Sequence, residues 1–424
     1  MALKSTLIVA ATVAATLAVV WLILNLSLGD KQIDTRLTRL YSVADEKFPR
    51  AMGTLLTPAL VPGNHVQLLL NGDQTFPAML KAIRSAQQSI TFETYIFWSG
   101  SIGNEFADAL MERAKSGVQV HILLDWIGGQ LDDTVLERMR ATGIEIQRYN
   151  APHWFNLHRL NNRTHRKLLI VDGRIGFTGG IGIADPWRGH AQDSQHWRDT
   201  HFRIEGPVVA QMQSAFGDNW LQATGDVLHG ERYLPDLVPA GPQRAQVFTS
   251  SAGGGAESMQ LMYLMSITAA AESIRISASY SVPDNVAINS LVAALERGVK
   301  VQIIVPGPHM DRAIVRRASR AEWGKLLVAG AEIYEYRPTM YHVKVMTVDS
   351  RWVSVGSTNF DNRSFSINDE ANLNVYDAAF ARRQIEVFED DLKQSRRITL
   401  EEWEERAWLE KILDSAASLL SSQL

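Results

Sequence analysis

Two short segments of the chain share the spacing His-x-Lys-x-x-x-x-Asp around an apolar run. In order, they contain His165, Lys167 and Asp172, and then His342, Lys344 and Asp349. Alternate residues of a strand lie on one face, so each histidine is expected to point into the same pocket as its lysine. The repeated spacing predicts that the two segments form one site together.

The residue types at this site predict phosphoryl chemistry. A neutral imidazole can attack phosphorus to form a covalent phosphohistidine, while a second, protonated imidazole gives its proton to the leaving oxygen and then acts as a base. The ammonium groups of Lys167 and Lys344 are expected to neutralise the non-bridging oxygens, a task otherwise often given to a metal. We therefore expect neither a metal ion nor a cofactor.

Polar residues near the motifs are expected to complete the site. Asp199 lies 34 residues after the first histidine and Glu370 lies 28 residues after the second. Both precede strand-like segments that could return to the motif, where a carboxylate would orient an imidazole. Ser357 and Asn359 are expected to complete the cradle of the phosphate oxygens, and Gly180 permits close approach of the backbone.

Three further carboxylates have structural alternatives. Asp172 and Asp349 each follow a buried strand, where they can cap the next turn or hold the lysine strand, so we expect a structural part rather than direct chemistry. Glu93 interrupts an apolar strand. Because burying an unpaired charge is costly, Glu93 is expected to line the cleft or to pair with a motif lysine.

The elements that precede the two motifs also repeat, which indicates an internal duplication. The helix stopped by Gly117 is matched by one ending at Gly298, and the turn at Gly143 is matched by one at Gly330. Matched positions lie 177 to 187 residues apart. Short apolar strands alternating with helices indicate α/β layers. We predict two pseudo-symmetric α/β sandwich halves with the active site between them.

Five segments are expected along the chain. They are an N-terminal transmembrane anchor at 1–29, a linker at 30–64, a first half at 65–235, a second half at 236–395 and a C-terminal helical segment at 396–424. The apolar run Leu7–Leu28 is long enough to cross a hydrocarbon core of about 30 Å. Basic residues follow it and favour a cytoplasmic body. A cleaved signal peptide is the alternative, although no Ala-x-Ala type of cleavage site follows the run.

Two other segments are candidates for contact with lipid. The C-terminal segment carries Trp403, Trp408 and Ile412 among acidic residues. Its pattern predicts a helix packed on the body; a membrane-surface helix is the alternative, which the acidic polar face disfavours. The aromatic and basic loop from His153 to Arg159 either lies at a membrane interface or packs within the protein.

The composition limits the classes of function. Hydrophobic residues make up 46% of the 424 residues and charged residues 21%, which is typical of a globular protein. The net charge of -4 argues against a general nucleic-acid-binding protein. The absence of cysteine excludes cysteine-based catalysis and thiolate metal sites.

The paired motifs resemble those of the phospholipase D superfamily, and the short sequence segments around them are similar to those of bacterial cardiolipin synthases. These segments include Asn162–Lys167, Gly176–Gly180, Trp197–His201, Gly356–Phe365 and Asn368–Glu370. The resemblance extends from about residue 65 to about residue 395. It implies a phospholipase D-like fold and a phosphatidyl group held on His165 and passed to a lipid alcohol such as phosphatidylglycerol, with His342 as acid and base. It also implies a phospholipid substrate and a bacterial inner membrane location.

The chain departs from the family pattern in two features; the single span leaves the acceptor alcohol open, whereas Val343 is expected to affect packing only. These synthases often have two N-terminal spans whereas one is expected here, and Val343 stands where a small residue usually separates histidine and lysine. A phospholipase D that gives the phosphatidyl group to water would use the same residues. A nuclease of the superfamily is disfavoured because one acidic chain carries both motifs. The sequence does not indicate an oligomeric state.

Overall fold

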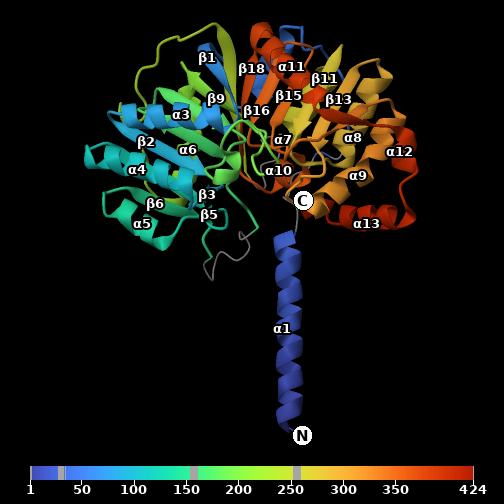
Figure 1. Cartoon of the computed structure of the whole chain (residues 1–424), viewed down its shortest axis with the longest axis horizontal. Coiled ribbons are helices and arrows are strands. Elements are labelled where there is room, and N and C mark those ends of the chain that lie inside the picture. Colours follow the sequence, from blue (N-terminus) through green and yellow to red (C-terminus); the bar gives the residue numbers. More distant parts are fainter. Residues whose placement is uncertain (1, 27–32, 34, 153–160, 252–258, 424) are drawn as a thin grey trace.

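The computed structural model of the chain describes residues 2–26, 33, 35–152, 161–251 and 259–423. Two similar α/β halves stand side by side in the body, and one long helix projects from it (Figure 1). The predicted two-half α/β architecture is confirmed.

Each half is built on strands in the same spatial order. The order in the first half is β6 (Glu145–Tyr149), β4 (Gln119–Asp125), β2 (Ser89–Thr94), β7 (Lys167–Val171), β8 (Ile175–Gly179), β9 (Thr200–Glu205) and β1 (Val61–Leu70). In the second half it is β14 (Glu332–Tyr336), β13 (Lys300–Pro306), β11 (Ser273–Ala278), β15 (Lys344–Val348), β16 (Trp352–Gly356), β18 (Glu370–Tyr376) and β10 (Gln243–Ser250). Strand β19 (Ser395–Ile398) lies outside β14. The two orders correspond strand for strand, as the repeated sequence pattern predicts.

The two sheets are continuous at their shared edge. Strands β1 and β10 pair in antiparallel fashion, with Val61 opposite Ala245 and Asn64 opposite Gln243. Strand β7 runs antiparallel to β2, and β15 runs antiparallel to β11 in the same way. Both motif lysines therefore begin their strands at corresponding ends of the two sheets.

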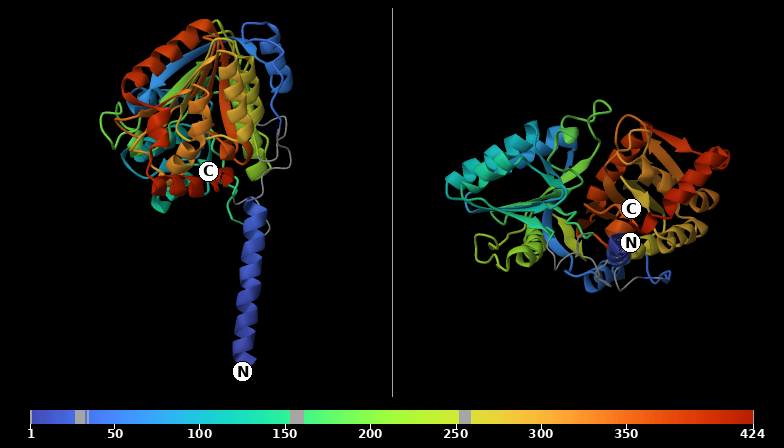
Figure 2. Two further views of the ribbon diagram at one scale, coloured as in Figure 1. Left: turned by 90° about the vertical axis from the view of Figure 1, so that its right-hand side faces the viewer. Right: turned by 90° about the horizontal axis from the view of Figure 1, so that it is seen from below.

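Helices cover both faces of each sheet, as the two views in Figure 2 show. In the first half they are α3 (Asn71–Ser85), α4 (Ser101–Lys115), α5 (Asp133–Arg140) and α6 (Val209–Thr224). In the second half they are α7 (Met259–Ala269), α8 (Asn285–Glu296), α9 (Ala313–Val328), α10 (Asn362–Ser366) and α11 (Ala378–Lys393). Leu168 and Leu169 pack into cores on opposite faces of the sheet. Burial on both faces explains why the motif strand is a continuous apolar run.

Short elements complete the connections near the strand ends. They are β3 (Phe97–Trp98), β5 (Gly129–Gln130), β12 (Ser281–Val282), β17 (Phe360–Asp361) and the 3-10 turn η2 (Asp185–Trp187). Strand β3 pairs with β5, and β12 pairs with β17.

The segment expected to be a linker contributes to the core of the second half. It contains α2 (Lys47–Leu55), in which Phe48 and Met52 are fully buried. The ring of Phe48 meets that of Trp352 edge to face, with centroids 5.1 Å apart. Burying these two side chains attaches α2 to the core of the second half, directly before β1.

The N-terminal helix α1 (Ala2–Leu26) is long and apolar enough to cross a membrane. Its candidate span, Lys4–Ile23, has a mean hydropathy of 2.4 and no part of it is buried against the body. At the other end of the chain lie α12 (Leu400–Glu404), α13 (Trp408–Ser418) and the 3-10 turn η4 (Ser421–Gln423). Helix α13 lies across the face from which α1 projects (Figure 1).

Candidate active site

The two motifs meet at one pocket between the halves. The pocket has a volume of about 470 Å³, and its lining includes both motif histidines. Other lining residues are Tyr95, Lys167 and Trp197 from the first half and Tyr280, Asn359 and Asp361 from the second. The structure thus brings together His165 and His342, which are 177 residues apart in the chain.

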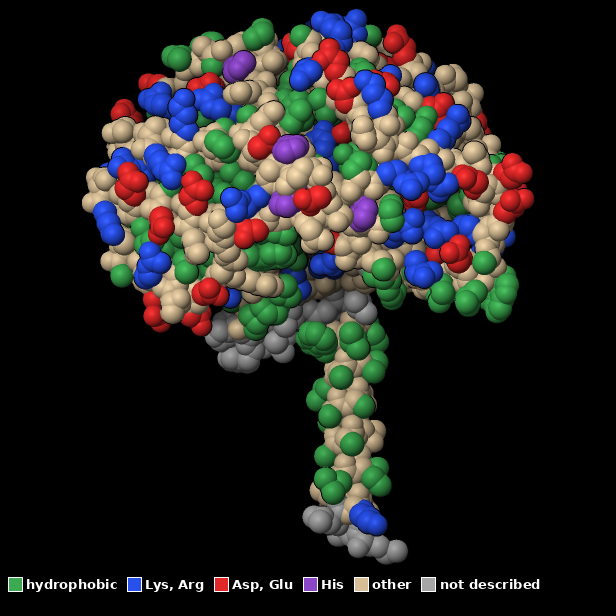
Figure 3. Space-filling model, viewed as in Figure 1, with side chains coloured by type: hydrophobic (Ala, Val, Ile, Leu, Met, Phe, Trp, Pro, Cys, Tyr) green, Lys and Arg blue, Asp and Glu red, His purple; other side chains and the backbone are tan. Residues whose placement is uncertain are grey.

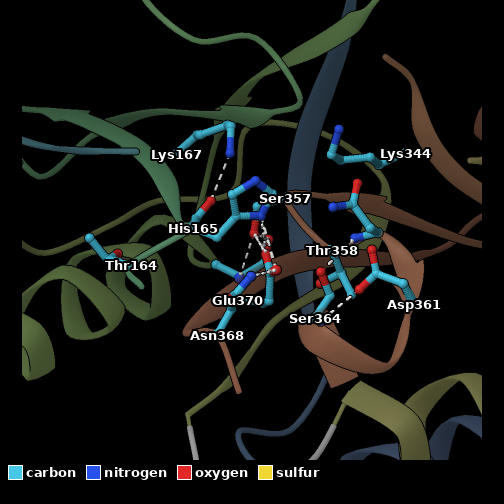
Figure 4. A network of polar contacts seen from close by, with 12 residues as sticks. Thr164, His165, Lys167, Lys344, Ser357, Thr358, Asp361, Ser364, Asn368 and Glu370 are labelled. Atoms are coloured by element: carbon cyan, nitrogen blue, oxygen red, sulfur yellow. Dashed lines mark hydrogen bonds and ion pairs between the residues drawn. The ribbon is translucent and has the colours of Figure 1, made fainter. Parts of the chain in front are cut away.

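The imidazole of His165 is held by a carboxylate from the second half. Its Nδ1 lies 2.9 Å and 3.0 Å from the two carboxylate oxygens of Glu370. The Ser357 hydroxyl donates to Glu370 at 2.5 Å, and the amide of Asn368 donates to it at 3.5 Å (Figure 4). The backbone N–H of His165 donates to the carbonyl of Asp369 at 2.9 Å, which fixes the main chain next to this pair.

The second histidine has the corresponding arrangement with the halves exchanged. His342 Nδ1 lies 2.7 Å from Asp199 Oδ2. The indole N–H of Trp187 donates to the same oxygen at 2.9 Å, and the backbone N–H of Thr200 donates to Asp199 Oδ1 at 2.7 Å. The backbone N–H of His342 donates to the carbonyl of Arg198 at 2.7 Å. Each carboxylate therefore faces the histidine of the other half, rather than the motif that precedes it in the sequence.

These contacts determine the tautomer of both histidines. A carboxylate only accepts, so each Nδ1 carries the proton and each Nε2 keeps a lone pair. Burial, followed for His342 by the nearby Lys344 ammonium, lowers the pKa of both imidazoles to about 4. Burial alone would raise the pKa of Glu370, but His165, Lys167 and the Ser357 hydroxyl lower it to about 2. The pair at neutral pH is thus a neutral imidazole and an ionised carboxylate.

The two motif lysines are buried beside the histidines. Lys167 Nζ donates to the carbonyl of His165 at 2.8 Å. Lys344 Nζ donates to the Ser279 hydroxyl at 2.7 Å, and this hydroxyl donates to Asn359 Oδ1 at 2.6 Å. Burial and the charge of Lys344 lower the pKa of Lys167 to about 7, and burial lowers the pKa of Lys344 to about 8. An anion bound between the two ammonium groups would restore their ordinary pKa values.

The two motif aspartates lie outside the pocket and have structural partners. The Asp172 carboxylate accepts from the backbone N–H groups of Gln88 at 2.7 Å and Ser89 at 3.0 Å. The Asp349 carboxylate accepts from the backbone N–H groups that precede β11, including that of Ser273 at 2.9 Å. Both aspartates have positive φ, 53° and 49°. Each aspartate therefore ties the end of its motif strand to the start of the neighbouring strand and does not line the pocket.

Glu93 was expected in the cleft or beside a motif lysine, and the structure places it in neither position. It is fully buried behind the first motif, where it accepts from the Thr164 hydroxyl and from the Asn219 amide at 2.7 Å. Burial raises the pKa of Glu93 to about 7, although the nearby Arg166 charge opposes this. Glu93 therefore positions Thr164, the residue before the motif histidine.

The remaining flanking residues divide between the pocket and its support. Asn359 lines the pocket. Ser357 is fully buried and its hydroxyl is bonded to Glu370, so it supports the carboxylate instead of cradling phosphate oxygens. A Cβ on Gly180 would lie 2.2 Å from Asp199 Oδ1, so this glycine leaves the space that the carboxylate occupies.

Some residues of the pocket were not predicted from the sequence. The ring of Tyr95 lies 5.3 Å from that of His165, and the ring of Trp197 lies 5.4 Å from that of His342. Arg163, Arg312 and Arg363 also line the pocket. Tyr95 directly follows β2, and ligands of α/β sheets bind at the carboxyl ends of strands, so its position carries a usable signal. The segment from His153 to Arg159 lies outside the described residues.

Known proteins resemble this chain in sequence and in fold. Residues 79–219 and 263–392 match the family described as cardiolipin synthase, PLD-like domain. Cardiolipin synthase A of Pseudomonas fluorescens is 33% identical over 374 residues, which cover 88% of this chain and 78% of the relative. Cardiolipin synthase of Alkalihalophilus pseudofirmus is 32% identical, over 85% of this chain and 72% of that protein. The phosphatidylserine synthase of Haemophilus influenzae has a similar fold, with a TM-score of 0.70, 14% identity and coverage of 89% of this chain and 100% of that one.

Proposed function

The chain belongs to the cardiolipin synthase family with a phospholipase D-like domain and is a phosphatidyltransferase, and we propose that it joins two phosphatidylglycerol molecules into cardiolipin and releases glycerol. The observation that carries this proposal is the pair of neutral histidines, each held through Nδ1 by a carboxylate of the other half, at one pocket. In the first step, His165 Nε2 attacks the phosphorus of the donor lipid. The N–P bond forms as the bond from phosphorus to the oxygen of the head-group glycerol breaks. A protonated His342 gives that oxygen its proton.

The second step reverses these roles with a new alcohol. The hydroxyl oxygen of the acceptor lipid attacks phosphorus, His342 Nε2 takes the hydroxyl proton, and the N–P bond to His165 breaks. The balance is one phosphodiester formed for each one broken. The free pocket holds both histidines neutral, so His342 must gain a proton when substrate binds. The negative charge of the donor phosphate favours that proton, because it offsets the two lysine ammonium groups that otherwise lower the pKa of His342.

The arginines at the pocket support an anionic lipid as the acceptor. Burial and the charge of Arg163 both lower the pKa of Arg363, so positive charge is crowded here. Arg312, which also lines the pocket, is exposed. A phosphatidylglycerol acceptor carries a phosphodiester of its own in addition to the reacting hydroxyl, and guanidinium groups suit such a phosphate. Water as the acceptor has no phosphate that these arginines could bind.

Analysis of the lipid products tests the proposed function. The purified full-length protein is supplied with phosphatidylglycerol alone, with added glycerol, or with phosphatidylethanolamine, and the products are separated. Cardiolipin and free glycerol are expected in equal amounts from phosphatidylglycerol alone, and excess glycerol should suppress net cardiolipin formation. The His165→Ala protein is the matched blank. Formation of phosphatidic acid without cardiolipin would instead assign the chain as a hydrolase.

We also propose that α1 is retained as a membrane anchor and that the body lies on the cytoplasmic side. Basic residues follow the span, among them Arg36, Arg39 and Lys47, and such residues favour the cytoplasmic side of a membrane. The chain has no cysteine, so one introduced on the body reports its side through a membrane-impermeant thiol reagent. Protection of this thiol in intact cells, with labelling after lysis, is the expected result. Labelling in intact cells would place the body outside.

A further inference from the structure

Helix α13 turns an apolar face away from the protein. Trp408 is 72% exposed, Leu409 is 52% exposed and Ile412 is 54% exposed. Leu413 and Leu419 continue this surface and are also exposed. Large apolar side chains that lie together in this way mark a surface that binds something apolar. We call this surface, formed by Trp408, Leu409, Ile412, Leu413 and Leu419, the α13 apolar face.

The helix is held on the body by its acidic side. Asp414 is buried, and its carboxylate receives the Arg406 guanidinium at 2.5 Å and lies 3.6 Å from that of Arg317. Glu410 pairs with Arg320 of α9 at 3.2 Å. A surface helix of a globular protein ordinarily buries its apolar stripe and exposes its charges. Helix α13 has the opposite orientation, so the acidic residues that argued against lipid contact are paired with arginines.

The α13 apolar face lies on the side of the molecule that faces a membrane crossed by α1. Figure 1 shows α13 across the face from which α1 projects, and Figure 3 shows hydrophobic side chains gathered at that edge of the body. The same segment reaches the active-site pocket. Ala417 packs with Val315, which lines the pocket, and Gln423 of the following turn η4 lines it as well. The amide of Asn161, another lining residue, donates to Gln423 at 3.0 Å.

We propose that α13 lies in the bilayer interface with its apolar face among the acyl chains, as a second attachment that holds the pocket mouth against the lipid. A single span attaches the body to the bilayer at one point only. An amphipathic helix inserts about 5–10 Å into the boundary between headgroups and acyl chains, and tryptophan is favoured at that depth. This placement rests on α1 crossing the same bilayer and concerns how lipid reaches the site, which goes beyond the transfer reaction itself.

A fluorescent probe on a single thiol tests the proposal in the full-length protein. Ile412→Cys and, separately, Leu409→Cys are labelled with an environment-sensitive dye, and the proteins are reconstituted into vesicles of phosphatidylcholine and phosphatidylglycerol. Val238→Cys is the matched control, because Val238 is 72% exposed in the loop before β10, a strand whose other end pairs with Glu370 at the site. Both α13 probes should show blue-shifted emission and be quenched severalfold more by nitroxide-bearing lipid than the Val238 probe. The Val238 probe should be quenched by aqueous iodide.

Two results would overturn the proposal. In one, the probes at residues 409 and 412 are as accessible to iodide as the control while the protein is embedded. In the other, the emission of both probes is blue-shifted already in detergent, the shift grows with protein concentration, and nitroxide lipid does not quench it. This result would assign the α13 apolar face to contact with a second copy of the chain. The fluorescence readout requires no turnover. A negative result would therefore contradict the proposed position of α13 without contradicting the proposed cardiolipin synthesis, which the analysis of lipid products tests separately.

Discussion

The Nδ1 atom of His165, in the first half, lies 2.9 Å from the carboxylate of Glu370, in the second half. His342 has the inverse relationship with Asp199, at 2.7 Å. Neither half therefore contains a histidine together with the carboxylate that orients it. Two backbone bridges cross the same junction, one joining Thr164 to Asp369 and the other joining Arg198 to Tyr341. The active site exists only when the halves are docked, which couples the geometry of one motif to that of the other.

Replacing Glu370 with glutamine should strongly reduce turnover without unfolding the protein. Glutamine keeps the size of the side chain but carries no charge, and its amide can turn its N–H groups toward Nδ1, which moves the imidazole proton to Nε2 and removes the lone pair from the pocket. By analogy with catalytic triads, we expect kcat to fall by about 10³- to 10⁴-fold. The measurement is the initial rate of cardiolipin formation together with the Tm. Asp199→Asn should have an effect of the same order.

Glu335→Gln is the matched control for this substitution. Glu335 is also a buried carboxylate of the second half, but it pairs with Arg316 at 2.5 Å and does not line the pocket. Its replacement should lower the Tm while the kcat of the folded protein stays within a few-fold of wild type. A Glu370→Gln protein that keeps its kcat within about tenfold would contradict the orienting role of the carboxylate, since such roles contribute more than this.

Trapping the covalent intermediate should distinguish the two histidines. His165→Ala removes the attacking nitrogen, so no phosphoenzyme should form. His342→Ala removes the acid and base but leaves the nucleophile, so a small amount of phosphoenzyme should accumulate from a donor lipid with a good leaving group. Because the two histidines act as one unit, each substitution should remove nearly all turnover and the double variant should be little worse. Because the N–P bond of a phosphohistidine is labile in acid, a reaction with phosphorus-labelled donor is quenched in alkaline denaturant and the protein-bound label is measured. Label on His165→Ala alone would exchange the assigned roles.

The repeated motif allowed the pocket and the two-half fold to be predicted, because local spacing on a strand determines which side chains share a face. That Glu370 and Asp199 each orient the histidine of the other half could not be predicted in this way. Spacing along the chain does not determine which half a strand approaches. The segment at 30–64 was expected to be a linker, yet it contains α2, whose Phe48 and Met52 are buried. The orientation of α13 depends on Arg317 and Arg320 of α9, which are distant in sequence.

Replacing Lys167 with methionine should stabilise the ligand-free protein while removing activity. The pKa of Lys167 is lowered to about 7 by burial and by Lys344, whereas the unfolded chain has the ordinary value of 10.5. Between these values the unfolded state binds more protons, so stability rises with pH through this range and the destabilising effect is complete below about pH 7. The variant should therefore have a Tm several degrees above wild type at pH 6.5, and the difference should shrink by pH 9.

Inorganic phosphate provides the control for this interpretation. An anion that binds the folded protein between the two lysines should raise the Tm of wild type in proportion to the logarithm of its concentration once the site is nearly saturated. The Lys167→Met protein should show a smaller rise, while sodium chloride at matched ionic strength should exclude a general salt effect. A variant with a lower Tm than wild type at pH 6.5 would show that Lys167 contributes favourable packing that exceeds the cost of its burial.

Asp172 should contribute to stability and little to turnover. Its carboxylate accepts three neighbouring backbone N–H groups, of Gln87, Gln88 and Ser89, and its own φ is positive. Alanine loses the acceptor and is strained at this φ, so we expect a cost of about 1–3 kcal/mol and a lower Tm. Asparagine keeps an acceptor oxygen and tolerates positive φ, so Asp172→Asn should recover much of the loss.

The same substitutions in the second motif separate structure from chemistry. Asp349 accepts from the backbone N–H groups of Ala271, Glu272 and Ser273 at 2.7 to 2.9 Å, so Asp349→Ala should destabilise the protein as Asp172→Ala does. In both variants the kcat of the folded fraction, measured well below the Tm, should stay within a few-fold of wild type. An Asp172→Ala protein with an unchanged Tm and a kcat lowered a hundredfold would contradict this structural part. The aspartate would then act on the reaction itself and would have to move to the pocket during turnover.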